Sequence, residues 1–151
     1  MSKLHDAKFV NVTPPAAIVD DASFTTAAID TLGYKYATVV FQLGATDIAM
    51  AALKLQESDA SGSGYTDIAG ADLSDAVDID GVATALPSDA DDNGLIVWQI
   101  DLRGRKRYLD VVATAGNGST GTFGACTAIL SRGDVAPESV AQAGCETLIR
   151  L

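Results

Sequence analysis

Two strand-like runs, a polar turn and a further strand-like run follow one another over residues 36–73. Residues 37–44 are rich in β-branched and aromatic side chains, and residues 51–57 alternate between apolar and polar positions. Residues 58–64 are small and polar, which favours a turn, before residues 65–68 resume the strand pattern. Because successive side chains of a strand point to opposite faces, this pattern predicts strands that are buried on one face only.

The same alternation returns after residue 94. A predicted strand over residues 95–102 places four large side chains on one face: Ile96, Trp98, Ile100 and Leu102. Trp98 is therefore predicted to anchor the core, since an aromatic side chain on a buried face contributes a large apolar area.

Two further strands are predicted near residue 115. Residues 107–114 and 122–130 both have strand patterns, and Asn117-Gly118 between them is typical of a type I′ hairpin turn. We therefore expect these two strands to pair as a hairpin with a flexible tip over residues 115–121.

Between seven and ten short strands separated by turns are typical of an all-β sandwich or barrel. We expect an antiparallel β-sandwich, and a jelly roll in particular. Three parts are expected along the chain: an N-terminal arm over residues 1–15, a β-sandwich domain over residues 16–136, and a C-terminal tail over residues 137–151 that packs on the domain or on a neighbour. Pro14-Pro15 ends the arm. In the tail, residues 138–143 predict a short helix and residues 147–151 a terminal strand.

Charge is distributed unevenly along the chain. The net charge of −10 argues against nucleic-acid binding through phosphates. Eleven acidic residues and no basic residue lie between Lys54 and Arg103. A basic cluster follows, made of Arg103, Arg105, Lys106 and Arg107. We expect this cluster to form a basic edge that contacts acidic partners, with a solvated basic turn as the alternative.

Few residues are suited to catalysis or to metal binding. His5 is the only histidine and lies in the predicted arm, where a catalytic triad is difficult to assemble. Cys126 and Cys145 are the only cysteines, so the chain lacks the four ligands of a structural zinc site, and both are predicted to be free thiols. We expect no enzymatic activity, no cofactor and no metal site of this kind.

The acidic segment 72–92 leaves one ligand-binding alternative open. Its last part and the next residue bring four oxygen-bearing side chains within five positions: Asp89, Asp91, Asp92 and Asn93. Calcium favours such ligands, although the spacing is not that of an EF-hand. A calcium site and a solvated loop both remain compatible with the pattern.

Four strand segments carry a resemblance to a known group of proteins. They are residues 39–44, 53–59, 107–112 and 128–131. The run Leu-Lys-Leu-Gln-Glu-Ser-Asp over residues 53–59, followed by a Ser/Gly turn, resembles small virion proteins of tailed bacteriophages that are usually encoded near the major capsid protein. The resemblance covers roughly residues 34–132. It implies a capsid decoration (cement) protein of the β-sandwich or jelly-roll type, a class that commonly sits as trimers on the outside of icosahedral heads.

This resemblance implies specific partners. We expect a homotrimer that binds the major capsid protein on the virion surface after synthesis in the host cytoplasm, with neither nucleic acid nor membrane as a partner. Phe9, Val10 and Val12 are candidate contacts, because a terminal strand can add to the sheet edge of a capsid or sister subunit. The alternatives are a carbohydrate-binding or host-attachment module of a virion, and another structural subunit of the head or tail.

Overall fold

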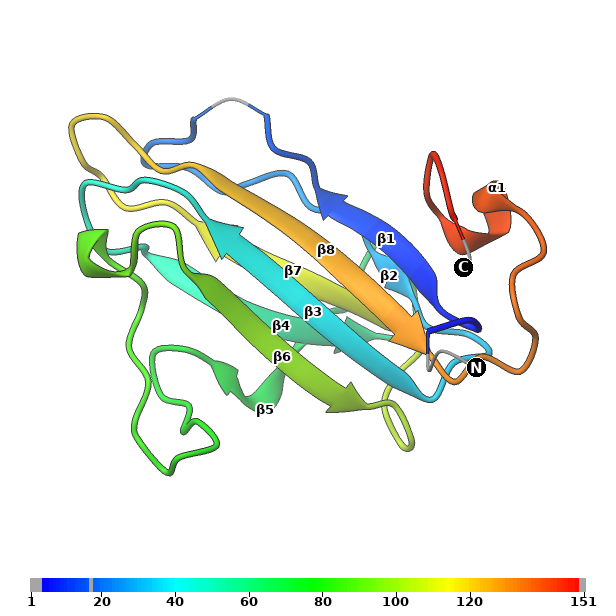
Figure 1. Cartoon of the computed structure of the whole chain (residues 1–151). Helices are drawn as coiled ribbons and strands as arrows, with labels where there is room; N and C mark the ends of the chain where they lie inside the picture. Colours follow the sequence, from blue (N-terminus) through cyan, green and yellow to red (C-terminus); the bar gives the residue numbers. More distant parts are fainter. Residues whose placement is uncertain (1–3, 17, 150–151) are drawn as a thin grey trace.

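In the part of the chain that the structure describes, eight strands form two four-stranded antiparallel sheets that pack face to face (Figure 1). The computed structural model describes residues 4–16 and 18–149. One sheet consists, in spatial order, of β1 (Lys8–Thr13), β8 (Gly124–Ser131), β3 (Tyr36–Leu43) and β6 (Leu95–Asp101). The other consists of β2 (Ile29–Asp30), β7 (Tyr108–Thr114), β4 (Ala52–Ser58) and β5 (Thr66–Asp72). The helical elements are a 3-10 turn, η1 (Asp89–Asp91), and one short helix, α1 (Val140–Ala143).

The strand order identifies the sandwich as a jelly roll. Strands at equal distance from the two ends of the series pair with each other: β1 with β8, β2 with β7, β3 with β6 and β4 with β5. Such an order results when a long antiparallel ribbon is wrapped into two sheets, which is the arrangement of a jelly roll. The predicted fold class, an all-β antiparallel sandwich of the jelly-roll type, is confirmed.

Alternate side chains of the strands meet between the sheets. Strand β3 contributes four buried residues to this core: Ala37, Val39, Phe41 and Leu43. The ring of Phe24 meets that of Phe41 edge-on, with 6.0 Å between the centroids. Trp98 is buried as predicted, and its Nε1–H donates to the carbonyl of Ala71 at 3.1 Å. This bond joins the edge strands β6 and β5 of the two sheets, so Trp98 supports the sandwich through both packing and hydrogen bonding.

The hairpin predicted between residues 107–114 and 122–130 is not formed. Strands β7 and β8 lie in different sheets, and the loop between them crosses from one sheet to the other. A period-two pattern indicates which face of a strand is buried but not which strand lies beside it, so the prediction of pairing was wrong. Strands β4 and β5 do pair across their polar turn, with Gln56 opposite Asp67.

The first strand belongs to the sandwich and not to a separate arm. Strand β1 pairs with β8 from Lys8 opposite Leu130 to Thr13 opposite Cys126, with one shift of register. Val12 is 1% exposed and lies in the core. The domain boundary expected at residue 15 is therefore corrected, because the sandwich already includes residues 8–13.

The described part of the tail packs against strand β1 (Figure 1). Helix α1 begins after Ser139, whose Oγ accepts the N–H of Gln142, and ends at Gly144, which has a φ of 74°. Ala143 is fully buried. The strand predicted over residues 147–151 is not formed by residues 147–149, and residues 150 and 151 lie outside the described part. In the part of the chain that the structure describes, neither helical element has the length or apolar character of a membrane span.

We predict that Gly144→Ala detaches the tail from β1. A Cβ at this position would collide with the carbonyl oxygen of Phe9, whereas Gly104, which also has a positive φ, has no atom within 4 Å of the corresponding position. The left-handed conformation costs a non-glycine residue about 1–2 kcal/mol in either place, so Gly104→Ala is a matched control for that cost.

Hydrogen exchange of the amides in residues 140–145 measures this effect. We expect loss of protection in the Gly144→Ala variant and unchanged protection of the tail in the Gly104→Ala variant. Equal tail protection in the two variants would show that the close approach between Gly144 and Phe9 does not hold the tail.

Candidate functional site

The predicted basic cluster lies in the turn between β6 and β7, and its arginines pair with acids of the same chain. Arg103 binds both carboxylate oxygens of Asp101 through Nε, at 2.9 and 3.0 Å, and also donates from Nη2. Hydrogen bonds from Arg103 lower the pKa of Asp101 to about 2. Arg105 Nη1 lies 3.3 Å from Glu57 Oε1. Half of this cluster therefore already has an acidic partner.

Of the other two basic residues, Arg107 is paired through its side chain, and Lys106 contacts an acid through its backbone. Arg107 donates from Nε and Nη2 to the two carboxylate oxygens of Asp30, at 2.9 and 2.8 Å. The hydrogen bond from Arg107 lowers the pKa of Asp30. The backbone N–H of Lys106 donates to the second oxygen of Glu57 at 3.2 Å. Contact of the four basic residues with an acidic partner stays a prediction, but these pairs leave much less positive charge at the turn than the sequence suggests.

The candidate contacts in β1 differ in their access to a partner. Val12 is buried, and Val10 packs partly buried against the core, so neither side chain forms an outer surface. Phe9 is half-buried, and the backbone of Gly144 lies against its backbone. Strand addition at this part of the β1 edge would therefore require displacement of the tail. The three residues are better described as the first strand of the sandwich than as an extended docking arm.

The outer face of the β1-β8-β3-β6 sheet carries four aliphatic side chains, interspersed with polar ones such as Gln42 opposite Leu95 and Thr127 opposite Val40. Leu95 and Val97 on β6 are 63% and 48% exposed. Val40 lies directly opposite Val97 on the neighbouring strand, and Ile129 follows on β8, two positions from the residue paired with Val40. Both are half-buried and occupy outward positions of their strands. We call this surface, made of Val40, Leu95, Val97 and Ile129, the apolar face.

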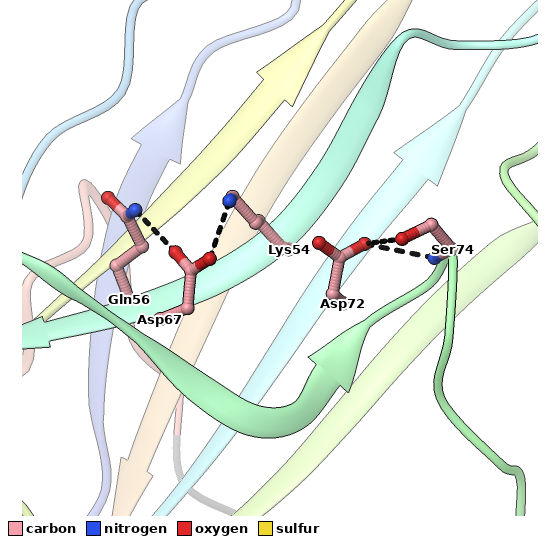
Figure 2. A network of polar contacts seen from close by, with 5 residues as sticks. All are labelled: Lys54, Gln56, Asp67, Asp72 and Ser74. Carbon is pink, nitrogen blue, oxygen red and sulfur yellow. Dashed lines mark hydrogen bonds and ion pairs between the residues drawn. The ribbon is translucent and has the colours of Figure 1, made fainter.

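The outer face of the other sheet is polar where β4 and β5 meet (Figure 2). Lys54 Nζ lies 2.7 Å from Asp67 Oδ2, and Gln56 Nε2 donates to Asp67 Oδ1 at 2.6 Å. The hydrogen bond from Lys54 lowers the pKa of Asp67. Asp72 accepts from the N–H and the hydroxyl of Ser74, at 2.9 and 2.7 Å. The two outer faces of the sandwich thus differ in polarity.

A groove of about 810 Å³ opens where the ends of β3, β6 and β8 meet the N-terminal segment. Tyr36 lies at its floor between Asp101 and Ser131, which pair with it from the two neighbouring strands. The guanidinium of Arg132 lies 5.1 Å from the centroid of the Tyr36 ring. The remaining lining residues are Leu4, His5, Asp6, Ala37, Thr38, Gln99, Ile100 and Ala136. Sequence reasoning missed this groove because its residues come from four separate segments.

The loop between β7 and β8 is anchored rather than flexible. The N–H groups of Ser119 and Thr120 donate to Asp47 Oδ2, the second at 2.8 Å. Gly118 donates to Asp20 Oδ1 at 3.1 Å, and a Cβ at Gly118 would collide with the Asp47 carboxylate. Backbone hydrogen bonds from Thr120 and Ser119 lower the pKa of Asp47. The N–H groups of the glycine-rich segment therefore bind the carboxylate of Asp47 in the same chain.

Two of the acids considered for calcium binding accept hydrogen bonds from backbone N–H groups. Asp91 Oδ2 accepts from the N–H of Ser88 at 2.9 Å, and Asp92 Oδ1 accepts from the N–H of Thr46 at 2.8 Å. Within residues 4–16 and 18–149, no three or more His, Cys, Asp or Glu side chains gather in a way that could hold a metal ion.

The residues considered for nucleophilic chemistry have different environments. His5 lines the groove on the outer surface, whereas Cys126 is buried on the inner face of β8. Burial raises the pKa of the Cys126 thiol to about 12, so this cysteine is not an activated nucleophile. Cys126 and Cys145 are both free thiols, as predicted.

No protein-family model matches the chain, and none of the curated proteins matches its sequence significantly. The choice between function classes therefore depends on the surfaces described above and on the resemblance noted in the sequence.

We predict that Asp47→Asn loosens the loop between β7 and β8. The neutral amide is a weaker acceptor for the N–H groups of Ser119 and Thr120 than the carboxylate is. In the native protein the folded-state pKa of Asp47 lies below its ordinary value of 3.8. The carboxylate therefore stabilises the fold fully above that value, and this contribution is lost as the pH falls through the folded-state pKa.

Amide chemical shifts of Ser119 and Thr120, followed from neutral pH downward, measure this anchor. We expect both to titrate together with Asp47 at a pH below 3.8, and to be displaced already at neutral pH in Asp47→Asn. Asp89→Asn serves as the control, because the structure gives its side chain no hydrogen bond within the described residues. Unchanged loop shifts in Asp47→Asn would contradict the anchoring role.

Proposed function

We propose that the protein is a structural virion protein, a capsid decoration (cement) protein that binds the outside of an assembled phage head and bridges its capsomers. The observation that carries this proposal is the apolar face, in which Leu95 and Val97 are exposed aliphatic side chains on a sheet surface. Exposed aliphatic side chains on a sheet surface suit a protein partner better than a small ligand, because small ligands are generally bound in concave pockets.

A weak contact through the apolar face is sufficient on a capsid, because the same binding site is repeated over the shell. Full burial of one large aliphatic side chain contributes about 1.5–3 kcal/mol, so Leu95 and Val97 alone support only a weak contact per copy. A trimer that engages three capsid sites at once multiplies this effect, since the second and third contacts are effectively intramolecular. Homotrimerisation and binding to the major capsid protein are parts of this proposal.

The jelly roll is a suitable scaffold for this role. Trp98 joins the two sheets, and internal carboxylates hold the turns at both ends of the sandwich. A body of this kind transmits mechanical load from one capsomer contact to another with little internal rearrangement. The proposed location is the virion surface, after synthesis in the host cytoplasm, and the role requires neither a cofactor nor nucleic acid or membrane as a partner.

We predict that the double variant Leu95→Gln, Val97→Thr binds decoration-free heads of the parent phage about tenfold more weakly than the native protein. The substitutions keep the approximate size of both side chains but add polar groups that a dry interface leaves unpaired. Leu32→Ser is the matched control, because Leu32 is equally exposed but lies in the turn before β3. Co-sedimentation with heads at increasing protein concentration measures the affinity.

The native protein must bind the heads for the proposal to hold. If it binds and the double variant binds equally well, the apolar face is not the contact surface. Thermal unfolding of both variants should remain within a few degrees of the native protein, since all three side chains point outward or lie in a turn.

A second candidate, a carbohydrate-binding or host-attachment module of a virion, is favoured by the groove. Tyr36 provides an aromatic ring at its floor, and Thr38, Gln99 and Asp101 line it with hydrogen-bonding groups. Sugar sites combine such groups, although here Arg132 already lies over the ring. A glycan array that is positive for the native protein and for Tyr65→Ala, but negative for Tyr36→Ala, would favour this function. A further alternative is that the protein is another structural subunit of the head or tail. The position of the protein in a reconstruction of the virion would distinguish this role from capsid decoration.

A further inference from the structure

The connection between β5 and β6 contains a small hairpin that extends away from both sheets (Figure 1). At its base, Val77 and Ala83 form an antiparallel bridge. The N–H and the hydroxyl of Thr84 both donate to the carbonyl of Ala76, at 2.9 and 3.1 Å, and the hydroxyl also donates to the carbonyl of Leu73 at 2.8 Å. Ala76 and Leu73 are buried, so the hairpin is fastened to the sandwich.

The tip of the hairpin is held by its own hydrogen bonds. The N–H of Asp78 donates to the carbonyl of Val82 at 2.9 Å, and the N–H of Gly81 donates to the carbonyl of Asp78 at 3.1 Å. Asp78 Oδ1 also accepts from the N–H groups of Asp80 and Val82, each at 2.9 Å. Gly81 has a φ of 79°, which a side chain would disfavour. The tip is therefore ordered before any partner binds.

This ordered tip presents aliphatic side chains to solvent. Ile79 is fully exposed at the turn, and Val77 and Val82 beside it are 64% and 59% exposed. Single exposed aliphatic residues are common on protein surfaces. Here three exposed aliphatic residues lie within six positions, on a turn that is held by backbone hydrogen bonds and by Asp78. Their exposure does not stabilise the fold of the chain itself.

Acidic residues lie next to these aliphatic side chains in the sequence. Asp78 and Asp80 lie on the hairpin, and Asp75 lies just before it, where Lys54 is its electrostatic neighbour. A partner surface that receives the hairpin therefore meets an apolar centre with an acidic border. Interfaces of this design pair a buried apolar anchor with a rim of complementary charge.

We infer that residues 77–83 are a docking knob, in which Ile79 enters an apolar pocket of a protein partner whose rim carries lysine or arginine. The preformed turn limits the conformational entropy lost on binding. The proposed trimer contact is assigned elsewhere on the surface, because the arginines of the basic turn of a second copy are paired internally and offer little free charge to the acidic residues of this hairpin. The inference rests on the proposed function in one respect, namely that the partner is a protein of the phage head.

The test uses decoration-free heads of the parent phage and the full-length protein. We expect Ile79→Asp to weaken binding about thirtyfold or more and Ile79→Ala to weaken it about tenfold, because the first change places a charge in the pocket. Val135→Asp is the matched control, since Val135 is also an exposed aliphatic residue but lies after β8. Circular dichroism and thermal unfolding should be unchanged in all three variants.

A photo-crosslinking residue at position 79 provides a second measurement. We expect it to crosslink to a head protein, and the same residue at position 135 not to do so. Raised salt should weaken binding of the native protein more than binding of Asp75→Asn, Asp80→Asn, because the double variant lacks two charges of the acidic border.

The outcomes separate the two proposals. If the native protein does not bind heads, the decoration function and the docking knob both fail. If the native protein binds and Ile79→Asp binds within twofold of it, the knob is refuted while the decoration function stands. If sedimentation reveals a native oligomer that Ile79→Asp dissociates, the knob docks on a second copy and the assignment to a basic head protein is wrong.

Discussion

Burial of alternate side chains between two sheets is the constraint on which the rest of this structure depends. Because β1 pairs with β8, β2 with β7, β3 with β6 and β4 with β5, every strand has one face on a shared core. The same arrangement gathers the connecting turns at the two ends of the sandwich. It also leaves two outer faces, whose residues are not needed for the core and are available for contacts with other molecules.

Outside the core, acidic side chains hold several turns and loops through hydrogen bonds. Asp47 holds the loop between β7 and β8, Asp78 closes the β5–β6 hairpin, and Glu57 accepts from the turn that carries the basic cluster. Several acidic residues therefore serve in turn formation or in internal ion pairs. Hydrogen bonds to ionised acceptors are stronger than neutral ones, which makes short acidic residues effective at holding exposed turns.

Two of the exposed surfaces carry aliphatic side chains that the fold itself does not use, namely the apolar face and the tip of the β5–β6 hairpin. The first lies on a sheet, whereas the second projects and is preorganised. Together they are consistent with a protein that adheres to a large assembly through several contacts, and the groove beside Tyr36 keeps a glycan ligand as the competing hypothesis.

The strand patterns of residues 37–44, 51–57 and 95–102 were sufficient to predict the strands, the core position of Trp98 and the all-β class, because side-chain alternation and β-propensity are local properties of the chain. Only the tertiary structure decided which strands pair and which side chains from distant segments meet. Residues 8–13 became an edge strand of the sandwich because β8, more than a hundred positions away, lies beside them. Two of the three acidic partners of the basic cluster, Asp30 and Glu57, are likewise distant in sequence, and no local pattern records which distant carboxylate will meet which guanidinium.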